Sequence, residues 1–315
     1  MNPGQRIILG IEGTYLTDSV ISILSKKQIG GIILFDHNGE NPNQLKALIN
    51  SIYNACEIKP FIAIDFEGGR IRRLKKFFHL LAKPSEYDGK ANELKSDCEN
   101  VGRDFKEYNI NLNLAPVADI SYSPLNAALE DRTFSADPLK TSEYCISFCE
   151  GFAKNNILCC LKHFPGLGSS TNDPHKLTAV SCLPYDRIRE NDLVPFKAGI
   201  NAGVNMLMTT HLLMTAIDDK IGAFSVKTTG LARALGFEGI IISDDLCMGA
   251  LKSEDSLPEI TLKSLCAGHD MALICHNHSR YNEIISYLEN NISVLEKHGH
   301  KRALERIRDA KESLS

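Results

Sequence analysis

The chain lacks an excess of basic residues and any long apolar run. Its 35 Lys and Arg residues face 39 Asp and Glu residues, which gives a formal net charge of -4. No broad positive field of the kind that gathers around nucleic acid is therefore expected. No apolar run approaches the roughly 18 residues needed to cross a bilayer, and Glu12 interrupts the N-terminal apolar stretch too early for a signal peptide. We expect a cytoplasmic protein that binds neither nucleic acid nor membranes.

Metal-binding and nucleotide-binding motifs are lacking as well. Most of the ten cysteines lie in apolar segments, as Cys159 and Cys160 do in ILCCLKHF, which is typical of reduced cysteines that pack as small hydrophobes. Cys145 and Cys149 have helical spacing but no CxxC or CxxH companion, so ordinary packing is favoured over a zinc site. No GxGxxG or Walker pattern occurs, and we do not expect the histidines to act as a clustered set of metal ligands. We predict no metal and no cofactor.

Eight short apolar runs recur along the chain, separated by stretches long enough for a helix and its loops. They occupy residues 6–11, 31–35, 61–65, 111–117, 157–164, 204–211, 239–245 and 271–277. Amphipathic patterns at residues 18–28, 44–55, 98–109, 141–156 and 228–237 predict helices between them. Buried strands that alternate with helices indicate a parallel sheet covered on both faces.

The eight repeats favour an α/β fold, a closed (β/α)8 TIM-type barrel, over an open doubly wound sheet. We expect one domain over residues 1–315. Residues 279–315 are predicted to form two charged helices, broken near Gly299, that pack on the outside of the barrel.

Polar residues collect where the predicted strands end. They are Asp36, Asp65, Asp119, His163, His211, Asp244 and Cys275. Active sites of such barrels lie at the carboxyl ends of the strands, where loops from separate strands converge. This end of the barrel is therefore the predicted site, although some strands end in polar residues for no functional reason.

Four segments carry a more specific signal: IAIDFEGGRIRRL, EDRTF, LKHFPGLGSSTNDPH and IISDDLCMGA. Together and in this order they resemble glycoside hydrolase family 3, specifically its single-domain β-N-acetylglucosaminidases, and the resemblance extends over nearly the whole chain. Cleavage of a glycosidic bond builds positive charge at the anomeric carbon and negative charge on the leaving oxygen. The enzyme therefore needs an anion on one face of the sugar and an acid near the leaving group.

The resemblance implies which residues supply these two groups. Asp244, the first Asp of SDD, is the implied nucleophile, and Asp245 the implied supporting residue; helix capping by both is the alternative. His175 is the implied acid/base, assisted by Asp173 two residues earlier. Histidine titrates near neutral pH, which suits a group that gives up a proton and later takes one.

The resemblance also implies five residues that hold the terminal sugar. They are Asp65, Arg73, Arg132, Lys162 and His163. An ion pair of Arg132 with Asp131 or Glu130 is the competing interpretation. His211 contacts either the substrate or the protein core. Gly68 and Gly69 are expected to permit a tight turn after the third strand.

Two positions depart from the family pattern. Leu167 replaces a histidine that many relatives have between the two glycines of KHFPGxG, and Pro174 stands in the loop between Asp173 and His175, where it restricts the backbone. We still expect a retaining exo-β-N-acetylglucosaminidase that acts as a monomer on a small carbohydrate substrate and removes terminal GlcNAc from peptidoglycan (muropeptide) fragments. The alternatives are a phosphorylase acting on the same glycosides and a catalytically inactive sugar-binding barrel.

Overall fold

The computed structural model describes residues 2–122, 126–170, 179–248, 251 and 255–314. Its central sheet has eight parallel strands, each inside one of the predicted apolar runs. They are β1 (Ile7–Gly10), β2 (Gly31–Leu34), β3 (Phe61–Ile64), β6 (Leu112–Asn113), β7 (Leu158–Phe164), β9 (Met206–Thr209), β11 (Ile240–Ile242) and β12 (Ala272–Ile274). The spatial order follows the chain order, β1 pairs with β12, and a parallel bridge between Ile242 and Met271 joins β11 to β12. The sheet closes, so the predicted (β/α)8 barrel is confirmed.

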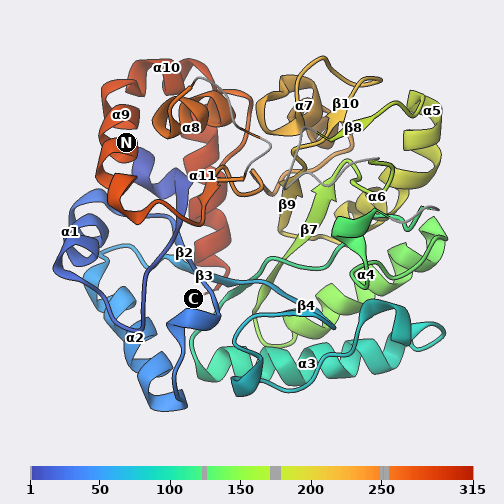
Figure 1. Cartoon of the computed structure of the whole chain (residues 1–315), viewed down its shortest axis with the longest axis horizontal. Helices are drawn as coiled ribbons and strands as arrows, with labels where there is room; N and C mark the ends of the chain where they lie inside the picture. Colours follow the sequence, from blue (N-terminus) through green and yellow to red (C-terminus); the bar gives the residue numbers. More distant parts are fainter. Residues whose placement is uncertain (1, 123–125, 171–178, 249–250, 252–254, 315) are drawn as a thin grey trace.

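Helices surround this barrel (Figure 1). They are α1 (Asp18–Lys27), α2 (Pro42–Ala55), α3 (Ala91–Glu107), α4 (Pro138–Ala153), α5 (Tyr185–Arg187), α6 (Leu193–Asn201), α7 (Val226–Ala234) and α8 (Leu257–Cys266). All five predicted helices are present. Their starts follow capping rules: the Thr17 and Asn41 side chains accept backbone N–H groups at the starts of α1 and α2. Within the described residues, none of the helices is both long enough and apolar enough to span a bilayer.

The C-terminal part contains three helices where two were predicted. They are α9 (Tyr281–Asn290), α10 (Ile292–Lys297) and α11 (His300–Glu312). The predicted break lies at Gly299, whose φ of 80° suits glycine, and a second break lies at Asn291. Helix α11 reaches the barrel itself, because Ile307 belongs to the cluster of side chains that fills the barrel interior.

Shorter elements connect these parts. The strands are β4 (Phe66–Gly68), β5 (Ile71–Arg72), β8 (Val180–Ser181) and β10 (Leu213–Met214). The 3-10 turns described are η1 (Pro3–Arg6), η2 (Asp36–Asn38), η3 (Lys75–Phe77), η4 (Pro84–Tyr87), η5 (Ala127–Leu129), η7 (Gly222–Phe224) and η9 (His278–Arg280), and η6 (Ile188–Asp192) is a π-helical turn. Strands β4 and β5 form an antiparallel hairpin directly after β3.

Alternation along the strands separates two apolar layers. On β3, Phe61 and Ala63 belong to the interior cluster, whereas Ile62 and Ile64 belong to the layer under the helices. The same alternation holds on β7 and β11, where Leu158, Cys160, Ile240 and Ile242 face inward. Continued by two residues, these inward rows lead to Asp65, Lys162 and Asp244. The fold therefore brings three predicted site residues to the barrel mouth, the end at which the strands finish.

Candidate active site

Asp244 continues the inward row of β11 at the barrel mouth. Its Oδ1 accepts the backbone N–H of Asp245 at 2.8 Å. Burial by itself raises the pKa of Asp244, but the electrostatic influence of His211, His163 and Lys162, together with this hydrogen bond, outweighs burial and lowers the pKa below its ordinary value. The carboxyl group is thus kept anionic at neutral pH, as a nucleophile requires.

Asp245 points away from Asp244 and ties two strand ends together. Its Oδ1 accepts the backbone N–H groups of Cys247 and of Cys275, both at 3.0 Å. Burial raises the pKa of this carboxyl, and the two backbone hydrogen bonds only partly oppose the rise. These hydrogen bonds hold the loop after β11 against the end of β12.

His211 is buried beside this pair of aspartates. Its Nε2 lies 2.9 Å from the carbonyl oxygen of Asp245, so Nε2 carries a proton and donates it. Its Nδ1 is buried and has no hydrogen-bond partner in the part of the chain that the structure describes. Packing alone leaves one ring nitrogen unsatisfied, and the free Nδ1 is a group that a bound substrate could pair with.

Glu67, which sequence reasoning missed, is the centre of the charged cluster at the mouth. Its side chain is 2% exposed, and its oxygens lie 2.7 Å and 2.8 Å from Nε and Nη2 of Arg132 and 2.7 Å from Nζ of Lys162. Burial raises the pKa of Glu67, but Arg132 and Lys162 reverse this and hold it far below its usual range. Glu67 stands two residues after Asp65 in an extended segment, so the alternation could have revealed it.

The interpretation of Arg132 as a partner of Asp131 or Glu130 is wrong, because its carboxylate partner is Glu67. Asp131 instead lies 3.7 Å from Nζ of Lys83. A bidentate pair between a guanidinium and a buried carboxylate fixes both planes. Arg132 also donates from Nη1 to the carbonyl of Ala128 at 2.9 Å, which leaves its remaining N–H groups in a fixed direction.

Lys162 joins this cluster to Asp65. Its Nζ lies 2.7 Å from Asp65 Oδ1, and its side chain is 4% exposed. Burial lowers the pKa of Lys162, but Asp65 and Glu67 raise it more, so the ammonium stays charged. The Asp65 side chain is 21% exposed, so its second oxygen can accept a hydroxyl proton.

His163 is held by a second carboxylate, Asp119. Its Nδ1 lies 2.6 Å from Asp119 Oδ2, and its backbone N–H is 3.2 Å from both Asp119 oxygens. Nη2 of Arg132 lies 3.5 Å from Nε2, which fits the tautomer with the proton on Nδ1. Sequence reasoning had placed Asp119 at a strand end but had given it no role; Asp119 orients the His163 ring.

Arg73 lies at the rim of the mouth. Its Nη1 is 3.6 Å from Asp36 Oδ2, its guanidinium carbon is 6.0 Å from the centre of the Phe35 ring, and its Nε has no hydrogen-bond partner among the described residues.

The tight turn predicted at Gly68 and Gly69 is confirmed between β4 and β5, with φ of 102° and 55°. A Cβ at Gly68 would lie 2.3 Å from a backbone oxygen of Ala82, so only glycine fits there.

Asp173 and His175 lie outside the described residues, as does Pro174. Leu167, the other departure from the family pattern, is 3% exposed, and its backbone N–H donates to Asp119 Oδ1 at 2.6 Å. The leucine side chain thus belongs to the core, while its backbone helps to hold Asp119.

Of the predicted site residues, the structure brings together Asp65, Arg132, Lys162, His163, His211 and Asp244, with Arg73 at the rim. Among the described residues, no group of three or more His, Cys, Asp or Glu side chains is placed to hold a metal ion.

Several known proteins are similar to this chain in sequence and fold. A Beta-hexosaminidase of Nitrosomonas eutropha is 32% identical over 301 residues, which cover 92% of this chain and 86% of that protein. NagZ of Neisseria gonorrhoeae, solved with N-trifluoroacetyl-D-glucosamine, superposes with a TM-score of 0.82 at 26% identity and covers 98% of this chain and 96% of its own. A fungal multi-domain GH3 beta-N-acetylglucosaminidase gives 0.95 at 27% identity over 99% of this chain, which spans only 39% of that longer protein.

The family model "Glycosyl hydrolase family 3 N terminal domain" matches residues 10–309, which is nearly the whole chain. This match confirms the resemblance read from the four motifs. The chain belongs to glycosyl hydrolase family 3, a family of glycoside hydrolases.

Proposed function

We propose that the chain is a retaining exo-β-N-acetylglucosaminidase that hydrolyses terminal β-linked GlcNAc, with peptidoglycan (muropeptide) fragments as its source of substrate. The observation that carries the proposal is an anionic Asp244 at the barrel mouth, facing a cluster of fixed hydrogen-bond donors. The choice of GlcNAc as the sugar is supported by the similar bacterial proteins named Beta-hexosaminidase and by the aminosugar bound to the Neisseria gonorrhoeae relative.

In the proposed mechanism, a carboxylate oxygen of Asp244 attacks C1 of the GlcNAc residue while the bond from C1 to the leaving oxygen breaks. The implied acid His175, oriented by Asp173, gives that oxygen its proton. Water then attacks C1 of the covalent glycosyl-enzyme, the bond from C1 to the Asp244 oxygen breaks, and His175 takes up the proton of this water. Two displacements on the same carbon return the anomeric configuration to that of the substrate.

The donors around Asp244 would hold the sugar hydroxyl groups and the N-acetyl arm. Lys162 uses its ammonium on Asp65 and Glu67, which leaves one of three N–H groups for a ligand. Arg132 is fixed by Glu67, so it loses little conformational freedom when a ligand binds. The free Nδ1 of His211 is a further contact point.

The Asp244→Ala variant tests the proposal. Removal of the nucleophile should lower turnover of p-nitrophenyl β-GlcNAc by at least about 10⁴-fold. Asp219→Ala, a change at an exposed aspartate on a different loop, is the matched control and should keep normal turnover. A 2-fluoro glycoside should label the wild-type chain at Asp244, and the label is located by peptide mass spectrometry. Near-normal turnover of Asp244→Ala would contradict the mechanism.

The reaction products separate hydrolysis from phosphorolysis. In phosphate buffer the wild-type enzyme should release free GlcNAc, detected by mass spectrometry. GlcNAc-1-phosphate as the main product would replace the proposed hydrolase with a phosphorylase.

A further inference from the structure

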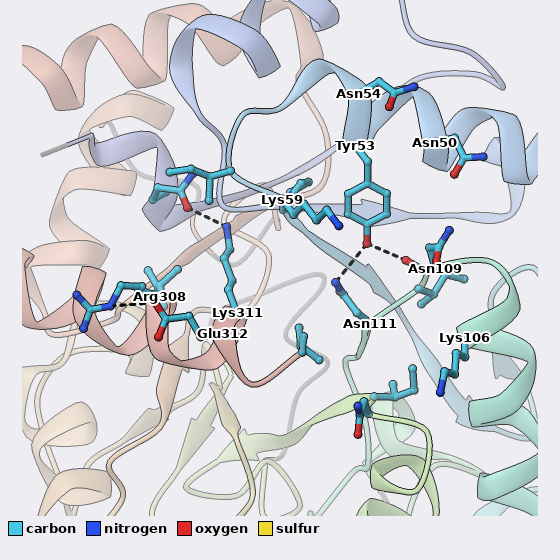
Figure 2. A pocket seen from close by; sticks show the side chains of 18 of the residues that line it. Asn50, Tyr53, Asn54, Lys59, Lys106, Asn109, Asn111, Arg308, Lys311 and Glu312 are labelled. Atoms are coloured by element: carbon cyan, nitrogen blue, oxygen red, sulfur yellow. Dashed lines mark hydrogen bonds and ion pairs between the residues drawn. The ribbon is translucent and has the colours of Figure 1, made fainter.

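A large cavity lies at the base of the barrel, the end at which the strands begin, away from the mouth. Its volume is about 1230 Å³, at or above the upper range for small-molecule sites. Residues just before β3, β6 and β7 line it, and so does α11. Figure 2 shows Arg308, Lys311 and Glu312 of α11 on one side and Tyr53, Lys106 and Asn111 on the opposite side.

The charges that line this base cavity do not balance. Four lining residues are cationic, namely Lys59, Lys106, Arg308 and Lys311, and Glu312 is the one acidic lining residue. Arg308 lies 2.8 Å from Asp309 and 3.7 Å from Glu312, so its charge is already offset by carboxylates. Three lysines are left over, in a chain whose overall net charge is -4.

None of these three lysines has a carboxylate partner within the described parts of the chain. Lys59 and Lys106 are exposed and make no ion pair there. Lys311 donates to the amide oxygen of Gln5 at 2.8 Å and lies 5.2 Å from the centre of the Phe61 ring. Burial lowers the pKa of Lys311 to about 8, and the nearby Cys56 offsets only part of this effect. The base cavity is therefore lined by three lysines that have no carboxylate partner among the described residues.

The remaining lining suits a ring that carries hydroxyl groups. Seven lining residues are asparagines, whose amides both donate and accept hydrogen bonds. The side chains of Asn50, Asn54 and Asn109 make no hydrogen bond to the described residues, so they are available to a ligand. Apolar side chains also line the cavity, among them the exposed Ile58, which can contact the face of a sugar or a base.

We propose that the base cavity binds a phosphate ester of a hydroxylated ring compound, either a sugar phosphate or a nucleotide. A phosphate monoester carries nearly two negative charges at neutral pH and three acceptor oxygens, which more than one ammonium group can share. A single carboxylate would leave most of the lysine charge without a partner. This site is separate from the proposed active site and does not depend on the proposed function.

Isothermal titration calorimetry tests the proposal with GlcNAc-6-phosphate and with AMP, each in the presence of excess GlcNAc to occupy the mouth. One equivalent of at least one ester should bind, and binding should weaken as salt rises. Lys59→Met, Lys106→Met and Lys311→Met should each weaken it about tenfold or more. Lys220→Met, at an exposed lysine that does not line the cavity, should leave it unchanged.

The ester that binds tells a sugar phosphate from a nucleotide. Because Lys59 and Lys106 are exposed, their variants keep the test valid if Lys311→Met fails to fold. The proposal is overturned if neither ester binds, or if the three lysine variants bind as tightly as the wild type. Equally tight binding of inorganic phosphate would also overturn it, since the ring would then contribute nothing.

Discussion

The two ends of the barrel differ in how their charged side chains are paired. At the mouth, Glu67 lies against both Arg132 and Lys162, so cations and carboxylates are paired within 2.8 Å. At the base, Lys311 meets only an amide and an aromatic ring. Paired charges hold donors in fixed directions, as catalysis requires. Unpaired cations leave a field that attracts an anion.

The strongest way to break this comparison is to remove the central carboxylate of the mouth. Glu67→Gln removes the buried carboxylate that Arg132 and Lys162 share and leaves Asp65 as the carboxylate paired with Lys162, so it should lower the free energy of unfolding by about 3 to 5 kcal/mol. Urea unfolding followed by circular dichroism measures the loss. Glu130→Gln, an exposed change near the same arginine, should stay within about 0.5 kcal/mol. A small effect of Glu67→Gln would mean that the ion pairs of Glu67 do not stabilise the mouth.

His269, a buried histidine in the barrel wall, is neutral in the folded chain and can be compared with the charged groups at both ends of the barrel. His269 lies 2.8 Å from Thr209 Oγ1 and 2.9 Å from the Ser264 carbonyl, and burial lowers its pKa to about 4. Between pH 6.5 and pH 4 the unfolded chain binds a proton at this residue that the folded chain does not. Stability therefore falls as the pH drops through that range, by about 3 kcal/mol from this group.

The His269→Gln variant isolates this contribution. Its free energy of unfolding should depend less on pH than that of the wild type between pH 4 and pH 6.5, as measured by urea titrations at several pH values. The same exchange at the exposed His298 serves as the control. Parallel pH profiles of His269→Gln and the wild type would show that the ring does not stay neutral in the fold.

A smaller effect is expected where α11 closes the base. Ile307 is 1% exposed and belongs to the interior cluster, but it also lines the base cavity. Ile307→Ala should therefore cost about 2 kcal/mol, at the low end for such truncations, because the site already adjoins open space. Thermal and urea unfolding measure it. Leu304→Ala, at a partly exposed position on the same helix, should lower the free energy of unfolding by less. An equal loss in the two variants would mean that Ile307 does not pack in the barrel interior.

The fold could be predicted in detail because its signal is local and repeated. Each strand is a short apolar run that is buried on both faces, and each predicted helix has an apolar face at helical spacing. The alternation on β3 even predicts that Asp65 continues the row of Phe61 and Ala63. The break at Asn291 was missed because nothing in the local pattern interrupts the helix there.

The candidate site was only partly predictable from sequence. The motifs and the strand ends indicated Asp65, Lys162, His163 and Asp244, and the structure brings these together. They did not indicate that Arg132 pairs with Glu67, because the two residues are 65 positions apart in the chain. The nearer Asp131 was the more obvious partner in sequence, yet it faces Lys83.

The sequence by itself determined the eight strands, the order in which they occur and the residues that end them, because periodicity and burial act between near neighbours. Only the tertiary structure decided which charges meet. Closing the barrel brings together the ends of β3, β6, β7 and β11, and it leaves Lys59, Lys106 and Lys311 around one cavity at the other end. Electrostatic pairing depends on distance in space, and barrel closure sets those distances.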